Sequence, residues 1–323
     1  MAETEINRIF TSRKAPSELI PARDSEGHKG TFGKVLLVVG SRNMAGAAIL
    51  AAKAAYRTGA GMVKVISPEC NRVIIQMAVP EALYMPSEAP DDEWQKSFSW
   101  CDCIGIGSGL GTDDNAFRSL EKVFTMTVKP LLIDADALNI LSKGMEGISL
   151  HSASGRPIVL TPHGGELARL VMAVDIRNSD LGDGRKFSMT AKDLDVMYKN
   201  LETLNKRRDE TVKQLDSAIL VSKNYSAVVV AKNADTLVVD AGGYYSKGQI
   251  FLNDRGNSGM ATAGSGDVLA GCITALMGQG LNPYEAACTG VQLHALAGDR
   301  VAKYRGEAWI MASDICENIG LDL

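Results

Sequence analysis

Short apolar runs recur along the whole chain, most of them flanked by glycine, and they constrain the fold more than any other feature. Several are apolar on both sides, as are strands of a parallel sheet that is covered on both faces. Segments with helical character lie between most of them; residues 44–58, for example, are rich in alanine and end at Gly59, a typical helix C-cap. We interpret the following runs as strands: KVLLVV (34–39), MVKVIS (62–67), CIGIG (103–107), PLLID (130–134), PIVL (157–160), AILVS (218–222), AVVVA (227–231) and TLVVD (236–240). The alternation predicts an α/β layered fold with a mainly parallel central sheet and helices on both faces.

Two features interrupt this alternation. Residues 172–200 are polar and indicate a surface excursion, which leads into a charged helix that ends near residue 216. Further along, AVVVA, TLVVD and a short candidate strand at QIFL (249–252) follow one another closely, so we expect an antiparallel edge. Beyond this edge, Asn282 and Pro283 are typical of a helix N-cap and first helical position, and they predict a long helix to about Tyr304.

The composition narrows the functional class. Of the 323 residues, 46% are hydrophobic and 22% are charged, as in an average globular protein. The net charge of −4 offers no broad basic surface, and the basic run at 206–208 is interpreted as a solvated helix face, so we expect no nucleic-acid partner. Apolar windows stay well short of the roughly 18 residues that span a bilayer, and residues 1–20 carry no signal-peptide run, so we expect a cytoplasmic protein without a membrane partner. Six cysteines without CxxC spacing are expected to be reduced and buried.

Residues 256–271 read GNSGMATAGSGDVLAG, a high density of small side chains. From Asp267 onward the apolar residues have helical spacing, so Gly264, Ser265 and Gly266 are expected to form the loop that enters a helix N-terminus. Unpaired backbone N–H groups and the helix dipole make such a loop an anion site, suited to a phosphate or to a phosphoryl group in transfer. Asp267 either stabilises the helix dipole or accepts a proton from a substrate hydroxyl, and one residue can do both. The stretch has neither the lysine of a P-loop nor the spacing of a Rossmann fingerprint.

Other polar residues have alternatives that the sequence leaves open. The glycine-dense GIGSGLGTDD (105–114) indicates close approach of the backbone to a ligand or to a neighbouring strand. Asp134 and Asp136 close a strand at the carboxyl edge of the sheet, where α/β folds bind ligands, but they are equally consistent with capping of the next helix. Asn139 either orients one of these acids or faces a neighbouring helix. His294 lies on an apolar helix face and is interpreted as a core residue.

Five motifs, in a fixed order, resemble those of a known family. They are KGTFGKVLLVVGSRNMAGAAILAAKAAYRTGAGMVKV (29–65), IGIGSGLG (104–111), LLIDADALNIL (131–141), LTPHGGELARL (160–170) and GNSGMATAGSGDVLAG (256–271). Together they are similar to the ADP- or ATP-dependent NAD(P)H-hydrate dehydratases, nicotinamide nucleotide repair enzymes related to sugar and hydroxyethylthiazole kinases. The resemblance implies a ribokinase-like three-layer sandwich, as a single catalytic domain over residues 28–323 that follows an N-terminal extension at 1–27. The epimerase domain that is fused to some members is expected to be absent, because no comparable sequence precedes residue 28.

The resemblance also implies a reaction. Members of the family remove water from NADHX and NADPHX, the hydrated forms of NADH and NADPH, and couple this to cleavage of ADP or ATP with Mg²⁺. The added hydroxyl is phosphorylated transiently and phosphate is then eliminated, which restores the dihydronicotinamide. Asp267 would be the base for that hydroxyl, and Gly264, Ser265 and Gly266 would form the anion hole. Family members are often homo-oligomers, so a homo-oligomer is expected, with a tetramer as one form.

Residue by residue, the resemblance assigns three groups of positions. The hydrate-binding positions are Ala47, Gly109, His163 and Asp267. The adenosine-phosphate segment, a Lys-Gly run that begins after a strand, corresponds to Lys223, Asn224, Tyr225, Ser226 and Ala227, with Gly266 also at the nucleotide. Glu166 has the place of the acid that holds Mg²⁺ through water. Four positions depart from the family pattern: Gly164 replaces a proline, Asn224 and Ala263 each replace a glycine, and Ser265 replaces a threonine.

Two other functions are consistent with these residues. A kinase of the same fold would use the same aspartate and anion hole to phosphorylate the hydroxyl of a hydroxyethylthiazole or hydroxymethylpyrimidine, and would release a phosphorylated product. A nucleotide-binding homologue without turnover would bind nucleotide tightly and not hydrolyse it. The sequence leaves open whether ADP or ATP is the donor and whether NADHX or NADPHX is preferred.

Overall fold

A single mixed sheet forms the centre of the protein. The computed structural model describes residues 20–144, 155–180, 208–241 and 248–321. Within these ranges the sheet has nine strands, in the order β3-β2-β1-β4-β5-β6-β7-β8-β9. The strands are β1 (Lys34–Val38), β2 (Met62–Ser67), β3 (Leu83–Pro86), β4 (Cys103–Ile106), β5 (Leu131–Ile133), β6 (Ile158–Leu160), β7 (Val228–Ala231), β8 (Leu237–Asp240) and β9 (Gln249–Leu252).

Most strand pairs are parallel, and the exceptions lie at one edge. Strand β1 pairs in parallel with both β2 and β4, so the chain reverses its direction of travel across the sheet at β1. Strands β7, β8 and β9 pair antiparallel, as AVVVA, TLVVD and QIFL predict. Both the mainly parallel sheet and the antiparallel edge are therefore confirmed. Because the parallel strands end at one edge, the loops after β1, β4, β5, β6 and β7 meet there.

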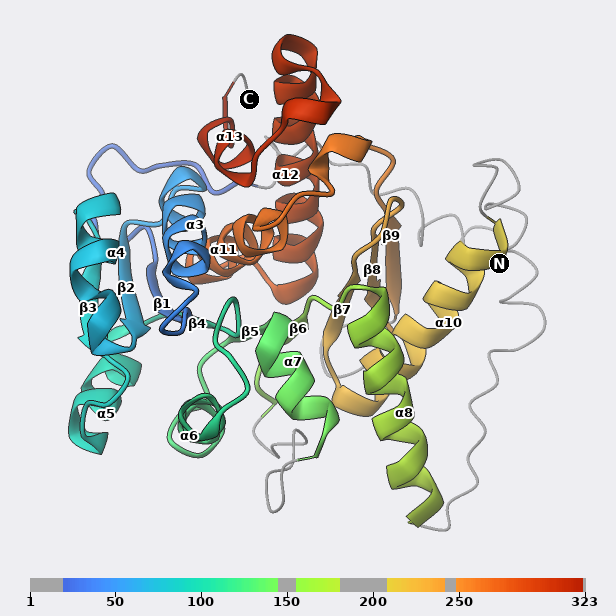
Figure 1. Ribbon diagram of the computed structural model, residues 1–323, viewed down its shortest axis with the longest axis horizontal. Helices are drawn as coiled ribbons and strands as arrows, with labels where there is room; N and C mark the ends of the chain where they lie inside the picture. Colours follow the sequence, from blue (N-terminus) through green and yellow to red (C-terminus); the bar gives the residue numbers. More distant parts are fainter. Residues whose placement is uncertain (1–19, 145–154, 181–207, 242–247, 322–323) are drawn as a thin grey trace.

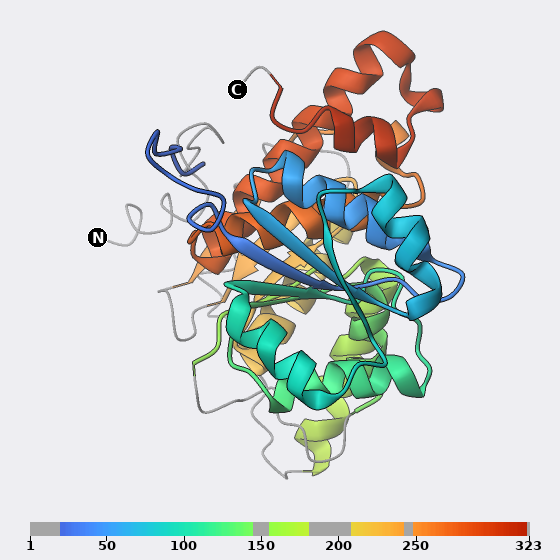
Figure 2. The same ribbon diagram turned by 90° about the vertical axis from the view of Figure 1, so that its left-hand side faces the viewer.

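Helices cover both faces of the sheet (Figures 1 and 2). One layer contains α3 (Ala45–Arg57), α4 (Arg72–Ala78), α11 (Ser265–Gly278), α12 (Pro283–Arg305) and α13 (Ala312–Glu317). The other contains α5 (Asp91–Trp100), α6 (Asp114–Thr125), α7 (Ala135–Ser142), α8 (Gly164–Asp180) and α10 (Arg208–Tyr225). Three short 3₁₀ helices, η1 (Glu69–Asn71), η2 (Ser258–Met260) and η3 (Glu307–Trp309), join these elements. The long helix predicted after Asn282 is confirmed, and the Asn282 side chain accepts a hydrogen bond from the Glu285 N–H at 2.9 Å.

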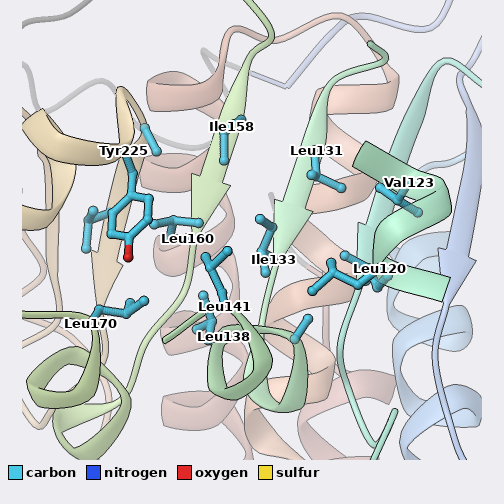
Figure 3. Close-up of a cluster of buried hydrophobic side chains, with 14 of the residues drawn as sticks. Leu120, Val123, Leu131, Ile133, Leu138, Leu141, Ile158, Leu160, Leu170 and Tyr225 are labelled. Atoms are coloured by element: carbon cyan, nitrogen blue, oxygen red, sulfur yellow. The ribbon is translucent and has the colours of Figure 1, made fainter. Parts of the chain in front are cut away.

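The core forms on both faces because strand side chains alternate. In β1, the side chains of Leu36 and Val38 belong to the cluster between the sheet and the layer of α5, α6, α7, α8 and α10. Those of Val35 and Leu37 belong to the cluster on the opposite face, with α3. Figure 3 shows part of the larger cluster, in which side chains from β5 and β6 meet those from α6, α7, α8 and the end of α10. Alternation of this kind explains why the strand runs are apolar throughout: both faces of each strand are buried.

Several predictions about individual elements were wrong, including the end of the charged helix near residue 216, because α10 continues to Tyr225. AILVS (218–222) belongs to α10 and is not a strand; its apolar residues line the buried side of that helix, with Leu215, Ala218 and Tyr225 fully buried at helical spacing. A five-residue apolar run fits a buried strand and a buried helix segment equally well. Strand β3 was not predicted, because LYMP is short and half-exposed at the sheet edge. The excursion expected at 172–200 begins later than predicted, since α8 continues to Asp180; residues 181–207 lie outside the described residues.

The described part of the N-terminal segment contacts the domain. Ile20 packs against the cluster that α11 and α12 form with the sheet, and the Arg23 guanidinium donates to the Gly59 carbonyl at 3.1 Å. None of the described helices is long and apolar enough to cross a bilayer. All six cysteines are free, and five are buried as predicted; Cys70 is exposed, which corrects that expectation for one position.

Close contact between α3 and α11 fixes the position of the helix that begins at Ser265. A Cβ atom added at Gly271 would lie 2.3 Å from the Ala51 carbonyl oxygen and 2.9 Å from the Ala54 Cβ. The two helices can approach this closely only because position 271 has no side chain.

We predict that Gly271→Ala lowers the free energy of unfolding by about 1–3 kcal/mol, because the added methyl forces the helices apart. Urea denaturation followed by circular dichroism measures this. The matched control is Gly46→Ala in α3, where an added Cβ meets nothing within 4 Å and the change is expected to be neutral or stabilising by up to about 1 kcal/mol. Equal stabilities of the two variants would contradict the packing argument.

Candidate active site

The glycine-rich loop ends at the N-terminus of α11. Gly264 is the N-cap residue, with a φ of 89°, and a Cβ there would lie 2.5 Å from Leu50 Cδ1. Glycine satisfies both constraints, because it alone adopts this φ readily and adds no side chain against α3. The helix begins at Ser265, so Ser265, Gly266 and Asp267 form its first turn. The Ser265 N–H donates to the Thr262 carbonyl at 3.3 Å, whereas the N–H groups of Gly266 and Asp267 lie where an α-helix leaves donors without helical partners.

Asp267 is partly buried beside other carboxylates. Burial and, after it, the nearby Asp134 carboxylate raise the pKa of Asp267 to about 6, although Ser108 and Lys232 act in the opposite direction. A carboxyl group with this pKa is mostly ionised near neutral pH and accepts a proton far more readily than an ordinary aspartate. It therefore has the properties of a general base.

Asp134 is the most enclosed acid of the site. It follows β5, is 1% exposed, and accepts three hydrogen bonds: from Lys232 Nζ at 2.7 Å, from Thr161 Oγ1 at 2.7 Å and from Ser108 Oγ at 3.1 Å. It stands at the N-cap position of α7, but its side chain makes no capping hydrogen bond. Its carboxylate thus joins the ends of four strands and does not cap the helix.

Asp136 and Asn139, which follow Asp134 in the chain, have hydrogen-bonding partners of their own. Asp136 accepts a hydrogen bond from the Gly111 N–H at 2.8 Å, which holds the loop after β4. Asn139 Oδ1 accepts from Arg169 Nε at 3.1 Å, so of the two alternatives for Asn139 the contact with a neighbouring helix, α8, is the one found. Gly107 explains the glycine density of the β4 loop: a Cβ there would lie 1.9 Å from the Asp134 carbonyl oxygen. The close approach expected from GIGSGLGTDD is therefore made to the segment that follows the neighbouring strand.

Lys232 is a site residue that the sequence analysis missed. It follows β7, is hydrogen-bonded to Asp134, and lies close enough to α11 that a Cβ on Gly266 would be 3.4 Å from its Nζ. Burial acts to lower the pKa of Lys232, but the Asp134, Glu166 and Asp267 carboxylates outweigh it and raise that pKa. The signal was present in the sequence: a second Lys-Asn pair, at 232–233, directly follows the strand run AVVVA.

The predicted nucleotide segment lies elsewhere. Lys223, Asn224 and Tyr225 end helix α10 and precede β7, so the segment does not follow a strand as the resemblance required. It lies at the amino end of β7, whereas Lys232 and Asp267 lie at the carboxyl end. The Tyr225 side chain is fully buried in the core (Figure 3), and Ala227 is also buried. The structure therefore does not bring Lys223, Asn224, Tyr225, Ser226 and Ala227 together with Gly266.

His163 and Glu166 form a local pair at the start of α8. Glu166 is 4% exposed; its Oε2 accepts from the His163 backbone N–H at 2.9 Å, and its Oε1 lies 3.2 Å from His163 Nε2. His163 Nδ1 accepts from the Gly165 N–H at 3.0 Å, so Nε2 carries the proton that is donated to Glu166. The pair resembles half of a capping box, in which Glu at the third helical position satisfies the N-cap amide. Position 164 does not require glycine for steric reasons, because an added Cβ meets nothing within 4 Å.

Two of the predicted hydrate-binding positions are in contact. A Cβ on Gly109, which has a φ of 62°, would lie 2.6 Å from the Ala47 Cβ. The first turn of α3 thus packs against the loop after β4, next to Ser108, which acts on both Asp134 and Asp267. His163, in turn, pairs with Lys232 across the loops that follow β6 and β7. Ala47, Gly109, His163 and Asp267 therefore all lie on loops or helix starts at the carboxyl edge of the sheet.

His294 contacts the first residue of α11 from within the core. Burial lowers the pKa of His294 to about 4, so the ring is neutral, and its Nε2 lies 3.2 Å from Ser265 Oγ. The interpretation of His294 as a satisfied core residue is confirmed. Its partner, however, is the first residue of α11, which connects the core to the candidate anion site.

The described residues contain no group of three or more histidine, cysteine, aspartate or glutamate side chains that could hold a metal ion. Glu166 is the acid that the resemblance assigns to Mg²⁺, and both of its oxygens face His163. Because Mg²⁺ in phosphate-transfer sites usually takes most of its ligands from water and substrate phosphates, one carboxylate at this edge fits such an ion.

Comparisons with known proteins agree with this geometry. The model of the NAD(P)H-hydrate dehydratase family matches residues 35–320. An ADP-dependent (S)-NAD(P)H-hydrate dehydratase from Neisseria meningitidis is 33% identical over 97% of this chain and 92% of its own length. A bifunctional NAD(P)H-hydrate repair enzyme from Moorella thermoacetica is 34% identical over 96% of this chain. The chain spans about half the length of that enzyme, 52%.

Solved structures give the same result. A ribokinase-like superfamily protein from Enterococcus faecalis superposes with a TM-score of 0.72 at 27% identity, covering 96% of this chain and 93% of its own. The ADP/ATP-dependent NAD(P)H-hydrate dehydratase from Bacillus subtilis, crystallised with ATP and Mg²⁺, superposes with a TM-score of 0.70 at 25% identity, covering 97% and 96%. The sandwich is therefore ribokinase-like, and the chain belongs to the NAD(P)H-hydrate dehydratase family.

Proposed function

We propose that this protein dehydrates NADHX and NADPHX to NADH and NADPH, with ADP or ATP as phosphoryl donor. The observation that carries the proposal is Asp267: a carboxylate with a pKa near 6, in the first turn of a helix whose N-terminus is built from glycine and serine. This combination suits a reaction in which a hydroxyl loses a proton while a phosphoryl group arrives beside it.

The reaction balances with these groups. Asp267 accepts the proton of the added hydroxyl as its oxygen bonds to the terminal phosphorus of the nucleotide, and the bond from that phosphorus to the bridging oxygen breaks. The N–H groups of Gly264, Ser265 and Gly266 hold the charge of the phosphoryl group in transfer. The carbon–oxygen bond then breaks, phosphate leaves, and the neighbouring ring carbon loses a proton to form the double bond. Ala47, Gly109 and His163 would contact the hydrated ring.

We propose further that the nucleotide phosphates lie against Gly266 and Lys232, in place of the segment at 223–227. Lys232 Nζ has Asp134 as its one acceptor among the described residues, so its remaining N–H groups are available to a phosphate. Mg²⁺ would neutralise phosphate charge, and Glu166 would hold it through water.

One exposed apolar surface is suited to contact between subunits of a homo-oligomer. Helix α4, next to the edge strand β3, exposes Val73, Ile74 and Met77 at 66%, 51% and 80%. Apolar side chains gathered in this way are typical of protein contact surfaces. The proposal also includes a cytoplasmic location.

The proposed reaction predicts recovery of absorbance at 340 nm when the protein is mixed with NADHX, Mg²⁺ and either ADP or ATP. Asp267→Asn should lower turnover by about 10²- to 10⁴-fold with little change in nucleotide binding, because a missing general base removes the proton acceptor. Unimpaired turnover in this variant would remove Asp267 from the mechanism. A phosphorylated product without recovery of absorbance would instead indicate a kinase.

The ionised Asp267 carboxylate should also lower the free energy of unfolding at neutral pH. Its pKa is about 6 in the folded protein and 3.8 ordinarily, so between these values the folded state binds more protons and stability falls as pH rises. Asp267→Asn should therefore raise the free energy of unfolding at pH 7.5 by about 1–3 kcal/mol, and the gain should vanish below about pH 4. Urea denaturation at both pH values measures this. Asp91→Asn, an exposed control, should change stability by less than about 0.5 kcal/mol, and a pH-independent gain at 267 would contradict the argument.

Lys232→Gln and Lys223→Gln distinguish the two candidate nucleotide segments. We predict that Lys232→Gln raises the KM for nucleotide at least about tenfold, because a charge-assisted bond to phosphate is lost, whereas Lys223→Gln leaves it unchanged. Steady-state kinetics with circular dichroism of each variant measures this. The reverse result would restore the segment at 223–227.

A further inference from the structure

The Ser108 hydroxyl lies between two carboxylates of the candidate site. Ser108 is in the loop after β4 and is 1% exposed. Its Oγ donates to Asp134 Oδ2 at 3.1 Å, and the same side chain hydrogen-bonds to Asp267, in the first turn of α11. A serine hydroxyl carries a single proton, so it serves as donor to one of these carboxylates at a time. Ser108 therefore connects the most enclosed acid of the site to the proposed base.

The two oxygens of Asp134 have different partners. Lys232 Nζ and Thr161 Oγ1 both donate to Oδ1, each at 2.7 Å, whereas Ser108 donates to Oδ2. A buried carboxylate is tolerated when it is paired and hydrogen-bonded, and the ammonium and the hydroxyl at Oδ1 meet this condition without Ser108. The Ser108 proton can therefore turn away from Asp134 without leaving an unpaired buried charge.

The charged groups that act on Asp267 come from the loops and helices beside it. Asp134 after β5 and Asp136 in α7 are carboxylates and disfavour its ionised form, whereas Lys232 after β7 favours that form. The Lys232 ammonium is itself bonded to Asp134. A hydrogen bond to an ionised acceptor is about twice as strong as one between neutral groups, so the Ser108 hydroxyl stabilises the ionised Asp267 and lowers its pKa against burial and the two acids.

We infer that Ser108 is a positioning residue for the proposed base: it donates to Asp267 while that carboxylate is ionised, and to Asp134 once Asp267 has accepted the proton of the substrate hydroxyl. The inference rests on the proposed function. In the first state the hydrogen bond holds the ionised carboxylate in one orientation. In the second, the new O–H of Asp267 donates to Ser108 Oγ, whose own O–H turns to Asp134 Oδ2. The exchange transfers no proton between the three residues, and Asp267 keeps a partner in both of its protonation states.

The titration of Asp267 tests the inference without any catalysis. In protein labelled with ¹³C at the aspartate carboxyl carbons, the Asp267 resonance is identified by its loss in Asp267→Asn, and its chemical shift is followed by NMR as pH changes. Ser108→Ala should raise the midpoint by at least about 0.5 pH unit, because the donor to the ionised form is removed. Ser108→Cys fills nearly the same space but offers only a weak donor, so it should raise the midpoint as well.

The matched control is Ser119→Ala in α6. Ser119 is also buried, at 4% exposure, but its hydroxyl donates to the Asn115 carbonyl at 2.8 Å, so this variant should leave the Asp267 midpoint unchanged. Circular dichroism of each variant checks folding. An unchanged midpoint in Ser108→Ala would overturn the inference. A wild-type midpoint in Ser108→Cys would also overturn it, because the space that the side chain fills, and not its hydroxyl, would then hold Asp267.

The pH dependence of kcat/KM for NADHX provides the second test. A base with a raised pKa is ionised only at higher pH, so Ser108→Ala should move the acidic limb of the profile upward. A shift of about 0.5 unit lowers kcat/KM about threefold well below the midpoint and leaves it nearly unchanged above about pH 8. An equal loss at every pH would indicate a purely structural role and would overturn the inference. A wild-type protein that fails to dehydrate NADHX would overturn the proposed function, and the NMR titration would still decide the role of Ser108.

Discussion

One buried carboxylate, Asp134, holds the ends of four neighbouring strands together, and the rest of the site depends on it. Its partners Ser108, Thr161 and Lys232 follow β4, β6 and β7, and Asp134 itself follows β5. A buried charge is tolerated only when it is paired and hydrogen-bonded, and here a cation and two hydroxyls satisfy it. The loops that follow these strands are therefore fixed relative to one another before any ligand arrives. Ala135, the next residue, has a φ of 45°, an uncommon conformation for a residue with a side chain and one that marks this turn as strained.

The same cluster sets the electrostatics of Asp267. Placing a second carboxylate near Asp134, in a partly buried position, raises its pKa, and Lys232 limits the rise without cancelling it. The raised pKa lowers the free energy of unfolding at neutral pH, and it also gives a carboxylate that accepts protons in the physiological range. Helix packing supports this arrangement, since Gly264 and Gly271 allow α11 to lie directly against α3. His294 adds a neutral partner for Ser265 from within the core.

Much of the fold could be predicted from the sequence, because strands that are buried on both faces leave apolar runs of strand length between helical segments. The run at 218–222 shows the limit of this signal: burial makes a strand and the inner face of a helix equally apolar, and only the neighbours of α10 decide between them. Strand β3 illustrates the opposite case, in which exposure at a sheet edge removes the apolar pattern. The motif positions at 163, 166 and 267 were identified from order and residue type.

The sequence by itself determined the layered α/β architecture, the helix that begins at the glycine-rich loop and the family, because these depend on local periodicity, on glycine and on the order of motifs. Tertiary structure decided which groups meet. Lys223 and Lys232 both precede an asparagine, yet only Lys232 follows a parallel strand and reaches Asp134, 98 residues away in the chain. The pKa of Asp267 was decided in the same way, because burial and the charges of Asp134 and Lys232 act through space. Interactions between residues distant in sequence leave no trace in local pattern, and the chemistry of this site consists of them.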